Sequence, residues 1–251
     1  MTEKPLSGQV AVVTGAAKNI GREIALMLAA DGASLVINGK SDKAAADAVV
    51  AQIEKTGGTA MVHMADVADP DQAQGLIEAA TEKFGRLDIL VINAGMRRQN
   101  SIVDIPLSEW REVMTMDLES PFVLAKHALP HMLENGHGRV VTLGGTSAHT
   151  GNVGRAHVGA AKMGLLSLTR SIAVEFGPNG VTANMVAPGH IDTVRGEAAG
   201  ERSKSGAGRP IQRMGKTSEI AGMVRHLCRP EGAYITGQCI HVDGGIYLGG
   251  A

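Results

Sequence analysis

The segment TGAAKNIG, from Thr14 to Gly21, has the residue types and spacing of a turn that binds phosphate groups. It follows a run of β-forming residues, QVAVVTG, and leads into a stretch with apolar residues at Ile20, Ile24 and Leu28, which is helical spacing. A glycine-rich turn between a strand and a helix lets backbone N–H groups and the helix N-terminus approach a pyrophosphate. We therefore expect a dinucleotide at this turn.

The residues after the second apolar run, SLVING, bear on the choice of dinucleotide. NAD-binding sites place an acid at the end of the second strand, where it contacts the ribose 2′-OH. This chain has Asn38 there, followed by Lys40 and Ser41, and no acid until Asp42. Lys18 lies in the first turn, so a 2′-phosphate would meet two lysines and no carboxylate. The pattern favours NADPH over NADH, and the alternative is that both lysines are ordinary surface charges.

Short apolar runs alternate with longer segments of helical spacing along the chain. The runs are continuous rather than alternating, which is typical of parallel strands buried on both faces. Strands separated by helices predict a single-domain, doubly wound α/β fold of the Rossmann type, with a parallel sheet. The predicted strands are QVAVVTG, SLVING, AMVHMADV, LDILVINAG, RVVTLGG, VTANMVAPG and QCIHVDGG.

The helical segments lie between these strands, and two of them carry local predictions. Ser41 is expected to cap the helix that ends before Gly57. The long segment from Ser108 to Glu134 is expected to break or kink at Pro121 and Pro130, because proline lacks a backbone N–H and crowds the preceding turn.

The size and composition indicate one dinucleotide-binding domain, residues 1–251. The net charge of −1 argues against a nucleic-acid partner. No apolar run approaches the ~20 residues that span a bilayer, and the N-terminal stretch lacks a signal-peptide core, so we expect a cytoplasmic protein that does not bind membranes. Cys228 and Cys239 are too few for a disulfide framework.

Residues 193–210 are rich in glycine, serine and charged residues. They are expected to form either a surface loop or a lid over the substrate.

Five motifs, in this order and spacing, resemble the short-chain dehydrogenase/reductase family: TGAAKNIG, ADV at 65–67, NAG at 93–95, Lys162 and APG at 187–189. The resemblance runs from Leu6 to Gly245 and is strongest to the classical branch that includes the oxoacyl-carrier-protein reductases. One departure is Asn19, which replaces the middle glycine of the family's first turn. Asparagine tolerates positive φ better than most residues, so the turn is expected to survive.

The resemblance implies that the chain binds a nicotinamide dinucleotide and assembles as a homotetramer through its long central helices and C-terminal strand. It assigns one group of residues to the pyrophosphate, one to the adenine and its ribose, and one to the nicotinamide. With the residues already discussed, the implied cofactor site comprises Gly15, Lys18, Asn19, Ile20, Gly21, Asn38, Lys40, Ser41, Asp66, Val67, Asn93, Ala94, Gly95, Lys162, Pro188, Gly189, Ile191 and Thr193.

The family's catalytic residues are largely replaced in this chain. The family uses a tyrosine, a lysine four residues later, a serine thirteen residues before the tyrosine, and an asparagine on the preceding long helix. Lys162 is retained, but the other three positions hold Val158, Gly145 and Asp117. Valine and glycine have no side-chain donor, and losing a general acid typically removes a factor of about 10²–10⁴. Ordinary carbonyl reduction by the usual route is therefore not expected.

A first interpretation is a substrate that needs no acid, such as an iminium ion, whose nitrogen already carries the positive charge. Asp117 would favour a cation there, or it would pair with Lys162, and the two roles can coexist. Replacing larger polar groups by Val158 and Gly145 predicts a roomy apolar pocket. The predicted substrate pocket is lined by Gly145, Val158, His190 and Arg97.

Two further interpretations remain open. A carbonyl reductase could use a relocated donor: His157, His149 or His190, or a hydroxyl of the residues that follow Gly145. His157 is about 100° around the helix from residue 158, so it is expected to point away from the cleft. Arg97 and Arg98 could bind an anionic group of the substrate, or be plain surface charges. The last interpretation is an inactive NADPH-binding sensor or partner subunit, or a chain inactivated by engineering.

Overall fold

The computed structural model describes residues 4–194 and 210–248. Its seven strands form one parallel sheet in the order β3-β2-β1-β4-β5-β6-β7. The predicted Rossmann-type fold is therefore confirmed. The strands are β1 (Val10–Val13), β2 (Ser34–Gly39), β3 (Ala60–Met64), β4 (Ile89–Ile92), β5 (Gly138–Leu143), β6 (Val181–Pro188) and β7 (Cys239–Val242).

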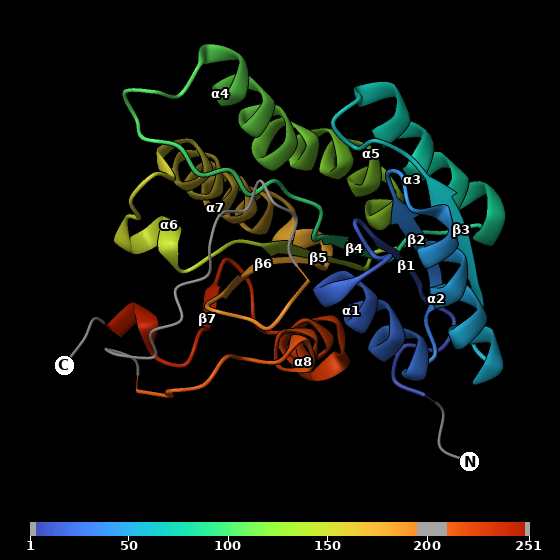
Figure 1. The fold of residues 1–251 in the computed structure, drawn as a ribbon. Helices are drawn as coiled ribbons and strands as arrows, with labels where there is room; N and C mark the ends of the chain where they lie inside the picture. Colours follow the sequence, from blue (N-terminus) through green and yellow to red (C-terminus); the bar gives the residue numbers. More distant parts are fainter. Residues whose placement is uncertain (1–3, 195–209, 249–251) are drawn as a thin grey trace.

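Helices cover both faces of this sheet (Figure 1). The main ones are α1 (Asn19–Ala30), α2 (Lys43–Lys55), α3 (Pro70–Phe84), α4 (Leu107–Met114), α5 (Ser120–Glu134), α6 (Ser147–Thr150), α7 (Ala156–Phe176) and α8 (Thr217–Cys228). Short 3₁₀ turns cover Gly177–Asn179, Pro230–Gly232 and Ile246–Leu248. Helices α1, α2 and α8 pack on one face, and α3, α5 and α7 pack on the other.

The continuous apolar runs are strands because both of their faces are buried. β1 (VAVV) and β4 (ILVI) are buried at every position, as parallel strands between two helical layers must be. In β1, Ala11 and Val13 join the core beneath α1, α2 and α8, and Val10 and Val12 join the core beneath α3, α5 and α7. The sheet thus separates two main apolar cores, one on each of its faces.

The two local helix predictions need correction. Asp42, not Ser41, caps α2: its carboxylate accepts a hydrogen bond of 3.0 Å from the Ala45 N–H. Ser41 lies one residue too early for its side chain to reach that donor. The long helix is not interrupted at Pro130, which lies inside α5.

The interruption predicted at Pro121 is present, and it lies in the turn that precedes this proline. Residues Thr115–Glu119 form a π-helical turn between α4 and α5. Pro121 has no N–H, so the carbonyl of Asp117 lacks its ordinary i+4 donor, and a widened turn accommodates this. Such turns are frequent at functional sites, and this one contains Asp117.

The proposed lid falls largely outside the described residues. Of residues 193–210, the structure describes Thr193, Val194 and Pro210. Among the helices within 4–194 and 210–248, none has the length and apolar character to cross a membrane.

Candidate functional site

A cavity of about 860 Å³ lies at the C-terminal ends of the strands, around the point where the strand order reverses between β1 and β4. Open α/β sheets bind their ligands at this position. Every residue predicted to bind the cofactor lines this cavity, and so do the four residues predicted to line the substrate pocket. Asp117 alone of the predicted site residues does not line it.

The turn after β1 is shaped so that a ligand can approach its backbone closely. Gly15 and Asn19 have φ values of +61° and +52°, and Asn19 is the one non-glycine residue with positive φ in the described part of the chain. The expectation that asparagine preserves the turn is confirmed. A Cβ at Gly21 would collide with the Gly15 carbonyl oxygen, so the chain requires glycine there. Helix α1 has no side-chain cap and no acid in its first turn, which leaves its N-terminus suited to an anion.

The side chain of Asn19 makes a contact that the sequence did not predict. Its Oδ1 accepts a hydrogen bond of 3.0 Å from the Val194 N–H, and its Nδ2 donates one of 3.0 Å to the Val194 carbonyl oxygen. Both residues line the cavity. Asn19 therefore ties the segment after β6 to the turn after β1, which a glycine at position 19 could not do.

The side chain of Asn38 does not face a cofactor ribose. It is buried, accepts a hydrogen bond from the Gly15 N–H at 3.3 Å, and donates to the carbonyl oxygens of His63 and Ala65 at 3.2 and 3.1 Å. Asn38 thus holds the turn after β1 against the end of β3. Alternation along β2 explains this orientation, because Val36 points to the same interior face.

Lys40 lies beside a carboxylate, contrary to the expectation from the sequence. Lys40 Nζ lies 2.7 Å from Asp66 Oδ2, and Asp42 also lines the cavity. Both partners of the Lys40–Asp66 pair are accessible to solvent, so the pair contributes little to stability and can rearrange for a ligand. Lys18 is exposed beside the first turn.

At the opposite end of the cavity, Lys162 pairs with Asp117. The Lys162 Nζ lies 3.6 Å from Asp117 Oδ1, which also accepts a hydrogen bond of 2.8 Å from the Met96 N–H. Asp117 is fully buried, and its Oδ2 has no hydrogen-bond partner. A Cβ on Gly95 would lie 2.9 Å from Asp117 Oδ1, so the glycine permits this close arrangement. The ion pair with Lys162, one of the two roles left open for Asp117, is present, and the carboxylate lies behind the cavity wall.

The wall beside Lys162 has no hydroxyl at the two positions that carry one in the family. Val158 and Gly145 both line the cavity there. Thr146 also lines the cavity, but its buried hydroxyl is engaged 3.2 Å from Asp243 Oδ2 and 3.3 Å from His241 Nδ1, so it does not replace the missing serine.

Of the three histidines considered as relocated donors, only His190 lines the cavity. His157 is fully buried, and its Nε2 lies 3.1 Å from Glu109 Oε1, so it points away as expected. His149 points toward Cys239 instead, and burial lowers the pKa of its imidazole. Arg98 is engaged with Glu112 at 3.0 Å, whereas Arg97 lines the cavity.

Comparisons with known proteins identify the family. A family model described as enoyl-(acyl carrier protein) reductase matches residues 15–247. The chain is 39% identical to a 3-oxoacyl-[acyl-carrier-protein] reductase of Synechocystis sp. over 97% of this chain and 98% of that protein.

Solved structures give the same result. A blue fluorescent protein from a metagenomic library, in complex with NADPH, matches with a TM-score of 0.91 at 38% identity, covering 96% of this chain and 98% of the other. A short-chain dehydrogenase from Burkholderia cenocepacia, in complex with NADP, matches with a TM-score of 0.88 at 34% identity, covering 96% and 98%. The chain belongs to the short-chain dehydrogenase/reductase family of NAD(P)-dependent oxidoreductases, and it is similar to the oxoacyl-carrier-protein reductases.

Proposed function

We propose that the protein is an NADPH-dependent oxidoreductase that transfers hydride to the carbon of a C=N bond in an imine or iminium substrate. The cofactor part rests on the family, on two similar structures that are complexes with NADPH and with NADP, and on the fit of the cavity. The glycine cradle of Gly15 and Gly21 and the uncapped start of α1 suit a pyrophosphate. When bound, NADPH supplies the hydride.

The residues at the adenosine end support the choice of NADPH. Lys18, Lys40 and Ser41 line that part of the cavity, and Lys40 would exchange its exposed contact with Asp66 for a 2′-phosphate. The end of β2 offers no acid for a ribose 2′-OH, since Asn38 is turned inward and Gly39 has no side chain. We propose that the remaining residues predicted to bind the cofactor contact its pyrophosphate, its adenosine and its nicotinamide, as the family implies.

One observation carries the proposal for the substrate. Lys162 is paired with the buried carboxylate of Asp117, and the neighbouring positions 145 and 158 carry no hydroxyl group. Reduction of a carbonyl develops negative charge on oxygen, and this requires a nearby cation and a proton. Here the positive charge of Lys162 is balanced by Asp117, and Val158 and Gly145 donate nothing. An iminium ion, which an imine forms by taking up a proton from solvent before it binds, becomes a neutral amine on hydride addition, so it requires neither a nearby cation nor a proton donor in the site.

We propose distinct roles for the two charged groups. Lys162 lines the cavity and would hold the nicotinamide ribose, as it does in the family. Asp117 is a positioning residue, because it acts on the cavity through Lys162 and through its charge. Arg97 lines the same cavity, so a substrate that carries a carboxylate besides its C=N bond would suit this charge distribution.

A screen of NADPH oxidation tests the substrate. It compares cyclic imines with and without a carboxylate, ketones and quinones, beside a relative that keeps the family's tyrosine. We expect imine turnover and little ketone turnover from this chain, and the reverse from the relative. Ketone turnover that disappears in His190→Gln would support a relocated donor instead. Tight NADPH binding with no turnover in the whole screen would support a sensor or partner subunit and refute the proposal.

We also propose that the chain works as one domain, in the cytoplasm, and as a homotetramer. Exposed apolar side chains before and along the long α4–α5 segment support assembly: Ile102, Val103, Leu107 and Phe122. Light scattering at micromolar concentration tests this, and a monomer mass would contradict it.

A further inference from the structure

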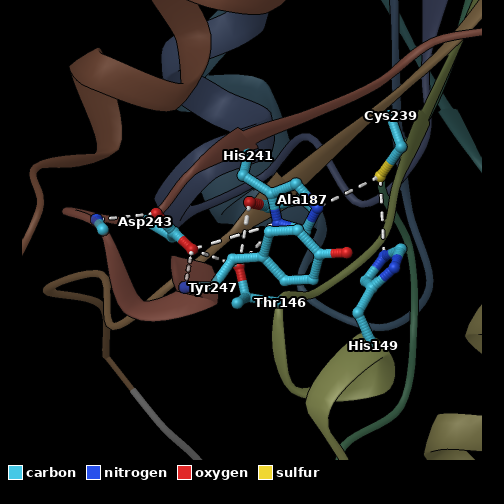
Figure 2. A network of polar contacts seen from close by, with 8 residues as sticks. Thr146, His149, Ala187, Cys239, His241, Asp243 and Tyr247 are labelled. Atoms are coloured by element: carbon cyan, nitrogen blue, oxygen red, sulfur yellow. Dashed lines mark hydrogen bonds and ion pairs between the residues drawn. The ribbon is translucent and has the colours of Figure 1, made fainter. Parts of the chain in front are cut away.

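We propose that His149, Cys239 and His241 form a binding site for a divalent transition metal, with Zn²⁺ as the best match. The three side chains converge from distant parts of the sequence: His149 lies in α6, and Cys239 and His241 lie on the same face of β7 (Figure 2). They lie outside the lining of the large cavity. The site is therefore separate from the proposed nicotinamide site.

The spacing of the ligand atoms matches a zinc coordination sphere. Cys239 Sγ lies 3.5 Å from His149 Nε2 and 3.9 Å from His241 Nε2, and the three ligand atoms all lie within 4.8 Å of one another. Zn–S and Zn–N bonds of about 2.3 and 2.0–2.1 Å at a tetrahedral angle place S and N about 3.6 Å apart. The two S···N separations differ from this by a few tenths of an ångström at most. The two imidazole nitrogens lie within 4.8 Å of each other and need about 3.3 Å, so a side-chain rotation that brings the rings together completes the site.

The surroundings of His241 are a second, independent observation. Its Nδ1 lies 3.3 Å from the Thr146 hydroxyl and 3.9 Å from Asp243 Oδ2, while its Nε2 faces Cys239. A metal-bound histidine commonly donates its other N–H to a hydroxyl or a carboxylate, which fixes the ring and the tautomer. Tyr247 stacks on His241 with ring centroids 4.0 Å apart and further restricts the ring (Figure 2).

The donor set determines the class of metal. One thiolate and two imidazoles suit Zn²⁺ and similar borderline-soft ions, and do not suit Mg²⁺ or Ca²⁺, which prefer oxygen. Burial raises the pKa of the Cys239 thiol, so metal binding releases its proton to solvent as the Zn–S bond forms. Three protein ligands leave a fourth position for water.

The site would join the C-terminal strand to the wall of the large cavity. Thr146 and His149 belong to the segment that follows Gly145, and Ser147 and Ala148 between them line the cavity. Metal binding would hold this segment against β7.

Metal titration of the full chain, made without an affinity tag that contains histidines, tests the proposal. After chelator treatment, Zn²⁺ is titrated in competition with a chromophoric chelator, and Co²⁺ is added separately as a spectroscopic probe. We expect one ion per chain and a thiolate-to-cobalt charge-transfer band. His149→Gln, Cys239→Ser and His241→Gln should each weaken Zn²⁺ binding by about a hundredfold or more, because loss of an outer-shell partner alone costs about 10–100-fold.

Two matched controls are His226→Gln, at an exposed histidine, and Cys228→Ala, at a buried thiol whose pKa burial raises to about 12. Both should bind Zn²⁺ like the unmodified chain. Circular dichroism and NADPH binding verify that each variant is folded. The proposal is overturned if the unmodified chain binds Zn²⁺ no more tightly than Cys239→Ser. A Co²⁺ complex without a thiolate band would overturn it even if a variant failed to fold.

Discussion

Replacing Asp117 by asparagine removes one charge from the buried Asp117–Lys162 pair. At the 3.6 Å separation of the two atoms, an effective dielectric constant of about 20 gives a gross attraction of about 4–5 kcal/mol. Desolvation offsets part of this, and breaking a buried pair costs about 3–5 kcal/mol. The Lys162 side chain is 13% exposed and lines the cavity, so water relieves some of the loss. We expect the free energy of unfolding to fall by about 2–3 kcal/mol.

The same change should lower imine turnover by about tenfold to a hundredfold, since a charge-assisted contact contributes roughly 1.5–3 kcal/mol. Urea unfolding of Asp117→Asn, Lys162→Met and the double variant gives the coupling energy, which should exceed about 1 kcal/mol. NADPH fluorescence separates lost cofactor binding from lost turnover. A coupling energy near zero would refute the electrostatic argument. Unchanged imine turnover in Asp117→Asn would leave the carboxylate only a structural partner of Lys162.

Three further predictions concern separate parts of the molecule. NADPH should bind at least about tenfold more tightly than NADH, a difference of about 1.4 kcal/mol; calorimetry measures this, and Lys40→Asp should reverse the preference. The double variant Val158→Tyr/Gly145→Ser should raise ketone reduction, because a Cβ at Gly145 meets no atom within 4 Å; a ketone assay with no gain would contradict this. Hydrogen bonds from Arg213 lower the pKa of Glu219 from 4.5 to about 2, so this interaction stabilises the fold above pH 4.5 and is lost as the pH falls toward 2. Acid unfolding of Glu219→Gln should lack that component, and an unchanged acid profile would argue against it.

The fold was predictable because it depends on local patterns. Strands such as VAVV and ILVI are buried on both faces, and this leaves a continuous apolar run in the sequence. The cofactor site was predictable for a similar reason, since its residues follow strand ends in short motifs. The π-helical turn at Thr115–Glu119 was not predicted, because a proline indicates that a helix must adjust but not at which residue.

Contacts between distant segments could not be predicted from one sequence. The Lys40–Asp66 pair and the contact between His149 and Cys239 form only when segments far apart in the sequence meet in the fold. The inward orientation of Asn38 did have a signal, because alternation along β2 places it on the same face as the buried Val36.

The two hydrogen bonds between Asn19 and Val194 have a consequence for amide hydrogen exchange. The Val194 N–H is protected by a side chain 175 positions away, so its exchange rate measures how often the contact opens. Both residues line the cavity, so a dinucleotide bound there would lie beside this amide and change its protection. The exchange rate of one backbone proton near the end of β6, compared with and without a dinucleotide, thus measures how far a bound ligand stabilises this contact.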